Sequence, residues 1–110
     1  MKLFNNLNDH TKFHARIRGD MMMASDSKKT LNYAEAWDYI NVIAAHIQSS
    51  GISKGDRVAI LAKNSVDNLC VFLACARIGA VVVGLNYRLA PAEVEFIASN
   101  AYVQMLFFDQ

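Results

Sequence analysis

The sequence lacks an excess of charge of either sign. Eleven lysine and arginine residues stand against ten aspartate and glutamate residues, so the net charge is +1, and no long run of like charge occurs. Proteins that bind nucleic acid or an anionic membrane surface gather positive charge on one surface. The composition therefore argues against both of these partners and favours a neutral or small-molecule one.

Cysteine is also scarce. Cys70 and Cys75 lie five positions apart in one apolar segment, and a helix would point the two side chains well away from each other. Neither a C-x-x-C motif nor a cysteine and histidine spacing suited to zinc occurs. We expect two buried, reduced thiols rather than a disulfide or a metal site, which is typical of a cytoplasmic protein.

No targeting or membrane-spanning segment is recognisable in the sequence. Polar residues interrupt the first 20 positions throughout, so we expect no signal peptide. The longest apolar run, residues 69–85, contains Arg77, Gly79 and Gly84. Because such a run is too short and too charged to cross a bilayer, we predict no membrane span.

Motifs for nucleotide, metal or covalent chemistry are missing as well. No G-x-G-x-x-G follows a predicted strand, and the segment GISKGD lacks the spacing and the Lys-Ser/Thr ending of a phosphate-binding loop. His10 and His14 stand four residues apart without a third metal ligand nearby, and His46 has no neighbouring nucleophile to activate. We therefore expect surface histidines, no catalytic residue and no metal site.

Hydrophobic periodicity and turn residues divide the chain into short elements, and a hydrophobic content of 54% is enough for the core of one small domain. Asn32 with Glu35 resembles a capping box, Gly51 and Gly79 suit the left-handed position that ends a helix, and Pro91 suits a first turn. The predicted elements are a weak helix within 3–14, a β-hairpin over 21–33, helices over 33–49, 66–78 and 91–101, and strands over 57–62, 80–85 and 103–108.

The order helix, strand, helix, strand, helix, strand after the hairpin predicts an α/β fold with three parallel strands joined by right-handed crossovers. Three such strands leave an apolar edge and a poorly covered face, and the sequence ends as the third strand ends. We therefore expect the N-terminal part of a larger domain. The isolated chain is expected to aggregate or self-associate.

Four polar residues, Asp56, Asn64, Asn86 and Arg88, fall at predicted strand ends. Residues there either complete backbone hydrogen bonds in turns or contact a ligand, and the turn role is favoured for each taken alone. Arg88 is the strongest ligand candidate, because a guanidinium can hold a phosphate or carboxylate through two hydrogen bonds.

Two segments carry family motifs. LNYAEA, residues 31–36, is similar to a motif that reads Leu, Thr or Ser, Tyr, any residue, Glu, Leu, with Asn32 in place of the hydroxyl residue. ARIGAVVVGLN, residues 76–86, is followed by the continuation NYRLAPAE. In this order the segments resemble the first two core motifs of the adenylate-forming superfamily, in the form typical of AMP-forming acyl-CoA synthetases. The resemblance covers residues 30–110, and the hairpin fits the same scheme.

The resemblance implies an activity and a set of ligands. Members of the family condense a carboxylic acid with ATP to an acyl-adenylate, using magnesium, and then pass the acyl group to CoA. It implies that residues 1–110 are the N-terminal segment of an AMP-binding large domain, ending before the phosphate loop, so that this chain alone needs no cofactor and makes no acyl-adenylate. In some CoA ligases the arginine that matches Arg88 lies near the CoA phosphates.

Two other functions stay open at this point. The chain is alternatively a non-catalytic, truncated binding or oligomerisation module derived from the family, which would associate through its exposed sheet surface. If the chain is a portion of a ligase, its partner is the remainder of the synthetase chain. If it is a non-catalytic module, a second copy of this chain is a candidate partner. An independent nucleotide-binding domain is the weakest interpretation, because the phosphate loop is missing.

Overall fold

The computed structural model describes residues 7–85 and 88–108, which form helices and strands in the alternation that the sequence predicts. In chain order the elements are α1 (Leu7–Ile17), β1 (Met22–Ser25), β2 (Thr30–Asn32), α2 (Tyr33–Ser49), β3 (Arg57–Leu61), α3 (Val66–Ile78), β4 (Val81–Leu85), α4 (Pro91–Asn100) and β5 (Val103–Phe108). The predicted α/β fold with a hairpin and three parallel strands is confirmed.

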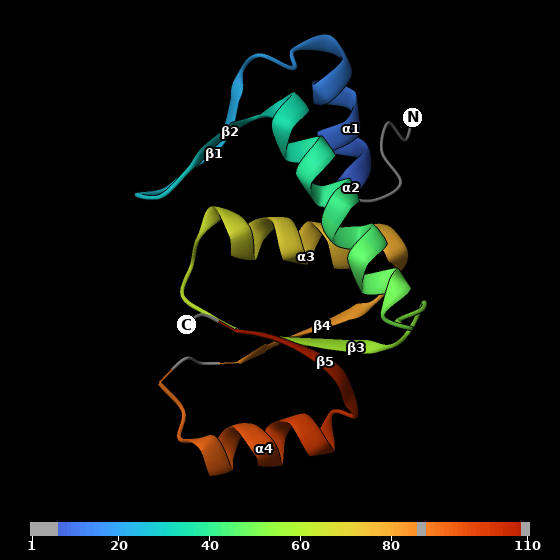
Figure 1. Ribbon diagram of the computed structural model, residues 1–110, viewed down its shortest axis with the longest axis vertical. Helices are drawn as coiled ribbons and strands as arrows, with labels where there is room; N and C mark the ends of the chain where they lie inside the picture. The colour runs from blue at the N-terminus through green and yellow to red at the C-terminus, as the bar shows by residue number, and fades with distance from the viewer. Residues whose placement is uncertain (1–6, 86–87, 109–110) are drawn as a thin grey trace.

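The three parallel strands form one sheet with β3 in its centre, in the order β4-β3-β5. β3 pairs with β4 from Arg57–Val81 to Leu61–Leu85, and with β5 along its other edge. The chain steps outward from β3 to β4 through α3, then returns across β3 to β5 through α4. Right-handed crossovers in opposite directions place their helices on opposite faces of the sheet, and Figure 1 shows α3 above the sheet and α4 below it.

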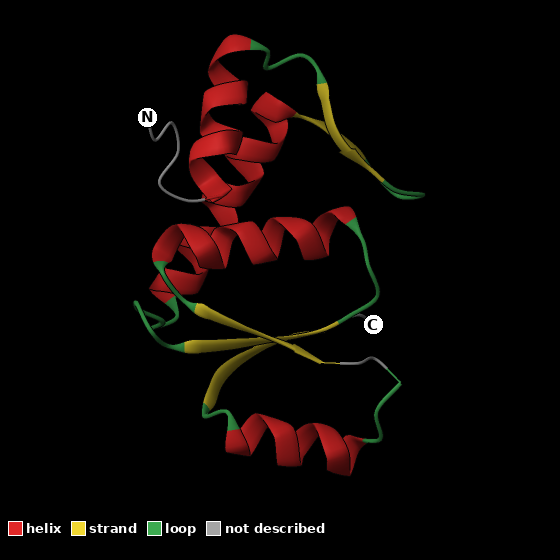
Figure 2. Ribbon diagram, turned by 180° about the vertical axis from the view of Figure 1, so that it is seen from behind, coloured by secondary structure: helices red, strands yellow, loops and turns green. Residues whose placement is uncertain are grey.

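A second helical layer lies on the far side of α3 from the sheet. α1 and α2 pack against each other and against α3, and the β1–β2 hairpin lies beside them (Figures 1 and 2). The core forms where α2, α3 and the central strand β3 meet. Its largest fully buried apolar side chains are Ile40, Ile47, Val58, Cys70 and Cys75.

The helix ends follow the predicted signals. Asn32 Oδ1 accepts from the Glu35 N–H at 2.7 Å, and Glu35 Oε1 accepts from the Asn32 N–H at 2.9 Å, which completes the capping box at the start of α2. Gly51, beyond the end of α2, and Gly79, at the end of α3, have φ angles of 95° and 78°. Glycine adopts these left-handed angles without the steric cost that a Cβ would bring.

Burial differs from expectation at two apolar residues. The apolar spacing in α3 places Leu69 on the face expected to be buried, and the sequence of β4 is typical of a buried strand, yet Leu69 is 39% exposed and Val81 is 46% exposed. β4 is an edge strand of the described sheet, with β3 as its one described neighbour. Sequence periodicity reports that a residue is apolar, whereas burial depends on which neighbouring element is present.

Candidate ligand-binding site at the carboxyl end of the sheet

The backbone topology defines a crevice between β3 and β4. These strands are neighbours, yet the loop after β3 leads to α3 on one face of the sheet and the loop after β4 leads to α4 on the other (Figure 1). In open parallel sheets, ligands bind outside the carboxyl ends of the strands where neighbouring connections part in this way. The candidate site is therefore positioned by the fold before any side chain is considered.

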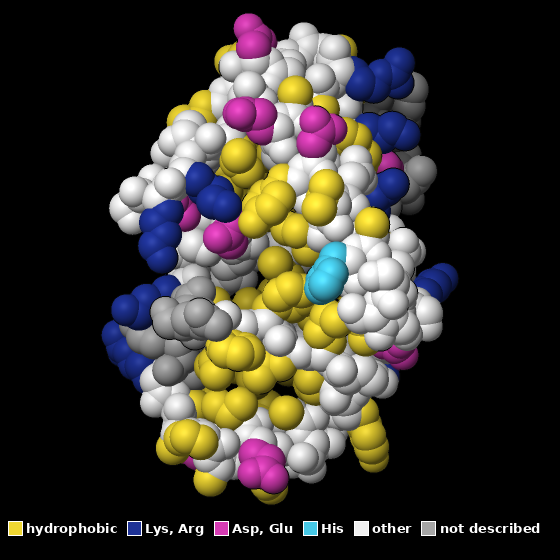
Figure 3. All heavy atoms as spheres, in the orientation of Figure 1, with side chains coloured by type: hydrophobic (Ala, Val, Ile, Leu, Met, Phe, Trp, Pro, Cys, Tyr) yellow, Lys and Arg dark blue, Asp and Glu magenta, His cyan; other side chains and the backbone are white. Residues whose placement is uncertain are grey.

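A cavity of about 380 Å³ lies at this crevice. Apolar side chains of β3, β4 and α3 form most of its wall, and the side chains of Asn64 and Asn68 add two amides. Smaller hollows of about 320 and 150 Å³ adjoin it, and both also contact Asn68. An apolar wall with a few polar groups is the usual character of a small-molecule site. Figure 3 shows hydrophobic side chains gathered over the sheet and between the sheet and its helices.

Gly84 leaves open space in the wall of this cavity. It lies in β4 opposite Ile60 of β3. A Cβ built on Gly84 would meet no atom within 4 Å, and its φ lies outside the left-handed region, so the backbone does not require glycine there. Glycine weakens a strand and often marks a position where a ligand or another backbone approaches closely.

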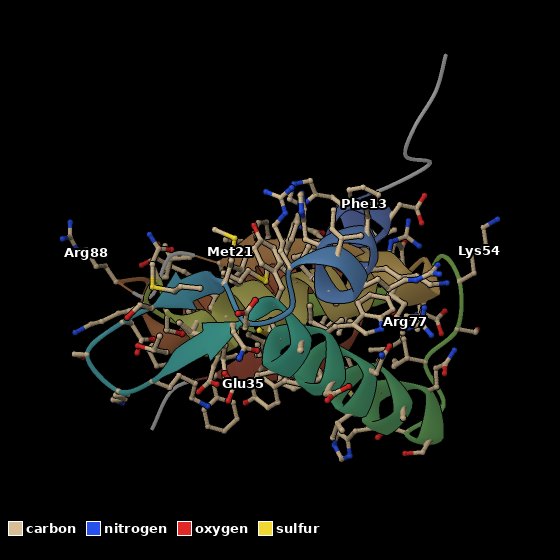
Figure 4. The ribbon with its side chains drawn as sticks, turned by 90° about the horizontal axis from the view of Figure 1, so that it is seen from above. Phe13, Met21, Glu35, Lys54, Arg77 and Arg88 are labelled. Atoms are coloured by element: carbon tan, nitrogen blue, oxygen red, sulfur yellow. The ribbon has the colours of Figure 1, made fainter. Side chains whose placement is uncertain are left out.

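Arg88 lies on the loop that follows β4, at the same end of the sheet as the cavity. Its side chain is exposed, and in Figure 4 it extends away from the body of the protein, at the opposite end from Lys54 of the loop before β3. Asn64 lies on the loop after β3 and lines the cavity. The structure thus places Asn64 and Arg88 at one edge of the sheet, on neighbouring loops.

Of the other two strand-end candidates, the structure describes only Asp56. Asp56 lies at the amino end of β3, where its Oδ2 accepts from the Ser53 N–H at 2.9 Å and its carbonyl oxygen accepts from the Val81 N–H at 2.7 Å. Its predicted turn role is therefore supported by direct contacts, and it lies away from the cavity. Asn86 falls outside the described residues.

A polar network joins the hairpin tip to the start of α3, and sequence reasoning missed it. Asp26 Oδ2 accepts from the Val66 N–H at 2.8 Å, across 40 positions of sequence. Lys29 Nζ and Tyr39 Oη each donate to Asp67 Oδ1 at 2.7 Å. The only local signal is Asp26 in a short polar turn, which predicts a turn but gives no information about a distant partner.

The network also sets the electrostatics of the α3 N-terminus. The N–H groups of Val66, Lys29 and Lys28 lower the pKa of Asp26. The hydrogen bonds from Lys29 and Tyr39 lower the pKa of Asp67. Two ionised carboxylates therefore lie at the positive end of the helix dipole. A phosphate would meet like charge there, so Arg88 is a better candidate for anion binding than the start of α3.

The histidines differ from the prediction in one case. His10 and His46 are exposed, as expected for surface residues. His14 is half-buried, with its ring centroid 4.3 Å from that of His10 and 5.0 Å from that of Tyr33. Its Nδ1 is buried without a hydrogen-bond partner. Burial and the nearby His10 and Arg18 lower the pKa of His14, so a neutral imidazole packs between α1 and the start of α2.

The two cysteines are free and buried, as predicted. Burial raises the pKa of each thiol to about 11, so neither is a nucleophile at neutral pH. Within residues 7–85 and 88–108, no group of three His, Cys, Asp or Glu side chains could hold a metal ion. In the same part of the chain, no helix has the length and apolar character needed to cross a bilayer.

Comparison with known proteins identifies the family. The model of the AMP-binding enzyme family matches residues 8–110. A long-chain-fatty-acid–CoA ligase, FadD13 of Mycobacterium tuberculosis, is 41% identical over 86 residues, which are 78% of this chain and 17% of the relative. A fatty acid–[acyl-carrier-protein] ligase, ScoC of Streptomyces coeruleorubidus, is 32% identical over 90% of this chain and 19% of its own length. The chain belongs to the AMP-binding enzyme family.

Solved structures show the same fold. The N-terminal domain of FACL13 from Mycobacterium tuberculosis superposes with a TM-score of 0.89 at 32% identity, over 96% of this chain and 27% of that one. The anthranilate CoA ligase AuaEII superposes with a TM-score of 0.91 at 21% identity, over the whole of this chain and 21% of that one. The chain thus spans less than a fifth of the length of the two curated relatives.

Proposed function

We propose that this chain is the N-terminal portion of an AMP-forming carboxylic acid–CoA ligase, which activates an acid with ATP to an acyl-adenylate and transfers the acyl group to CoA. The family match over residues 8–110 carries the proposal. Fatty acids are the first substrates to test, since a relative that is 41% identical is a long-chain-fatty-acid–CoA ligase.

Arg88 is proposed to contact a phosphate of CoA. Three observations support this role: its position after β4, its exposed side chain, and the neighbouring cavity with its apolar wall and two amides. The space beside Gly84 leaves room for a ligand group at the same edge. An exposed guanidinium at a switch-point crevice has the chemistry and the access needed to hold a phosphate.

ATP and magnesium are assigned to other parts of the ligase. The described residues contain no metal-ligand cluster, and the two carboxylates at the start of α3 oppose anion binding there. Transfer of the adenylyl group from ATP to a carboxylate, with release of pyrophosphate, depends on positioned groups that stabilise developing charge. We therefore infer that the 110 residues alone do not form acyl-adenylate.

The proposed partner is the remainder of the ligase chain, in the cytoplasm. β4 and β5 are the edge strands of the described sheet, and Phe96, Tyr102 and Phe108 are 68%, 75% and 60% exposed. Exposed apolar groups and open strand edges both call for a covering element. Self-association through the same surface is the alternative, and size-exclusion chromatography of the 110-residue chain distinguishes an assembly from a monomer.

The Arg88 proposal is tested in a ligase polypeptide that contains this chain. Because a charged, bidentate hydrogen bond contributes about 1.5–3 kcal/mol, Arg88→Ala should raise the KM for CoA by about 10-fold to 100-fold. Acid-dependent exchange of pyrophosphate into ATP should stay unchanged. Arg57→Ala is the matched control, since Arg57 is an exposed arginine at the amino end of β3. An unchanged KM for CoA in Arg88→Ala would refute the assignment.

A further inference from the structure

We propose that the hairpin tip acts as a clamp that positions the β3–α3 loop against the cavity, and that Asp26 is its positioning residue. The clamp consists of contacts within this chain. Its consequence for ligand binding rests on the proposed function, because it takes the cavity as the ligand site.

The Asp26 carboxylate accepts hydrogen bonds from two separate parts of the chain. Its Oδ1 accepts from the N–H groups of Lys28 and Lys29, at 2.8 and 2.9 Å, and this closes the hairpin turn. Its Oδ2 accepts from the N–H of Val66, the first residue of α3. A turn needs only the first pair of bonds, so the bond to Val66 is an additional function of the same carboxylate.

A second set of contacts, at Asp67, also joins the hairpin to the start of α3. Lys29 Nζ lies 2.7 Å from Asp67 Oδ1, and the same ammonium lies 4.7 Å from the centroid of the Tyr39 ring. The Tyr39 hydroxyl also donates to Asp67. The hairpin and α2 thus both hold the residue that follows Val66, so that charge-assisted bonds fix two consecutive residues of the first turn of α3.

These fixed residues lie next to the wall of the cavity. Ser65 Oγ, one residue before Val66, accepts from the Asn68 N–H at 3.0 Å, and the Asn68 side chain donates to the Lys63 carbonyl oxygen at 3.3 Å. Asn64 and Asn68 supply the two amides of the cavity. A shift of Val66 would therefore move the loop from Lys63 to Ser65 and both amides with it.

Hydrogen–deuterium exchange of a longer ligase polypeptide that contains this chain tests the clamp without any ligand. Asp26→Ala should increase exchange in peptides over residues 63–69 by about tenfold, because loss of the bond lets the first turn of α3 open locally. Exchange in the core of α2, over residues 40–47, should not change. Asp38→Ala is the matched control, since Asp38 is an exposed aspartate on α2 outside the network, and it should leave residues 63–69 protected.

A second variant separates positioning from general destabilisation. Asp26→Asn keeps an oxygen that can accept from Val66 but loses the charge, so exchange over residues 63–69 should fall between wild type and Asp26→Ala. Equal increases over residues 63–69 and 40–47 in Asp26→Ala would show that Asp26 only stabilises the fold, and no increase over 63–69 would show that it holds nothing there. Either result overturns the proposal.

A kinetic measurement tests the link to the cavity. In the ligase that contains this chain, Asp26→Ala should raise the KM for CoA several-fold while kcat stays within about twofold, because misplaced amides weaken binding without touching the reacting atoms. A fall in kcat with an unchanged KM would overturn this link. The exchange experiment does not depend on CoA, so failure of the proposed function would leave its result intact.

Discussion

Replacing Gly84 by alanine and replacing Gly79 by alanine should change the stability of the protein in opposite directions. At Gly84, the added methyl group would enter open space, and φ is not left-handed. Replacing glycine inside a strand then stabilises the protein by about 0.5–1 kcal/mol, because the unfolded chain has less freedom to lose. At Gly79, φ is +78° and the new Cβ would lie 2.9 Å from Lys54 Cγ. The left-handed angle alone costs about 1–2 kcal/mol.

Urea unfolding, monitored by the fluorescence of Trp37, measures both changes in stability. Trp37 is the single tryptophan, and Arg77 of α3 lies 5.1 Å from its ring, so the signal reports the α2–α3 contact. With a slope of about 1–3 kcal/mol per molar urea, Gly79→Ala should lower the midpoint by about 0.3–2 M, and Gly84→Ala should raise it slightly. A fall of the midpoint in Gly84→Ala comparable to that in Gly79→Ala would refute the open space assigned to the wall of the cavity.

Four further predictions concern the burial, backbone angle or pKa of individual residues. Ile40 is fully buried, so Ile40→Ala should lower the free energy of unfolding by about 2–5 kcal/mol in urea titrations, and a loss below about 1 kcal/mol would contradict its core position. Tyr102 has a left-handed φ of 55°, so Tyr102→Gly should stabilise the chain by about 1 kcal/mol in the same assay. The buried thiols, with pKa values of about 11, should react with a thiol reagent at pH 8 only after unfolding. Because the pKa of His14 is lowered in the folded state, its contribution to the free energy of unfolding is fully present above the unfolded pKa of 6.5 and falls as the pH drops below that value. In urea titrations at several pH values, His14→Gln should weaken this dependence of the free energy of unfolding on pH.

Local signals were sufficient to predict most of the fold. The capping box at Asn32 and Glu35 and the helix-ending glycines Gly51 and Gly79 each act within a few residues, so the sequence contains their whole cause. The alternation of helices and strands then leaves few topologies for a parallel sheet. Burial at the edge of β4 was not predictable, because it depends on neighbours that the local pattern does not specify.

The sequence indicated candidates for the site rather than its arrangement. Arg88 and Asn64 were candidates because they follow predicted strands, and residues there fall at the carboxyl end of a parallel sheet. Asp56 is also a polar residue at a strand end, but it precedes its strand, which places it at the opposite end of the sheet. The clamp was missed because its bonds join residues 28 to 40 positions apart, and no periodic pattern encodes such a pair.

Pyrophosphate release shows whether the 110 residues activate an acid by themselves or only as a portion of a longer ligase. A panel of carboxylic acids, long-chain fatty acids included, is offered with ATP and magnesium to the 110-residue chain and to a ligase polypeptide that contains it. We expect acid-dependent release by the longer polypeptide and none by the 110 residues. Release by the 110-residue chain with any acid, or no release by the longer polypeptide with every acid, would contradict this expectation.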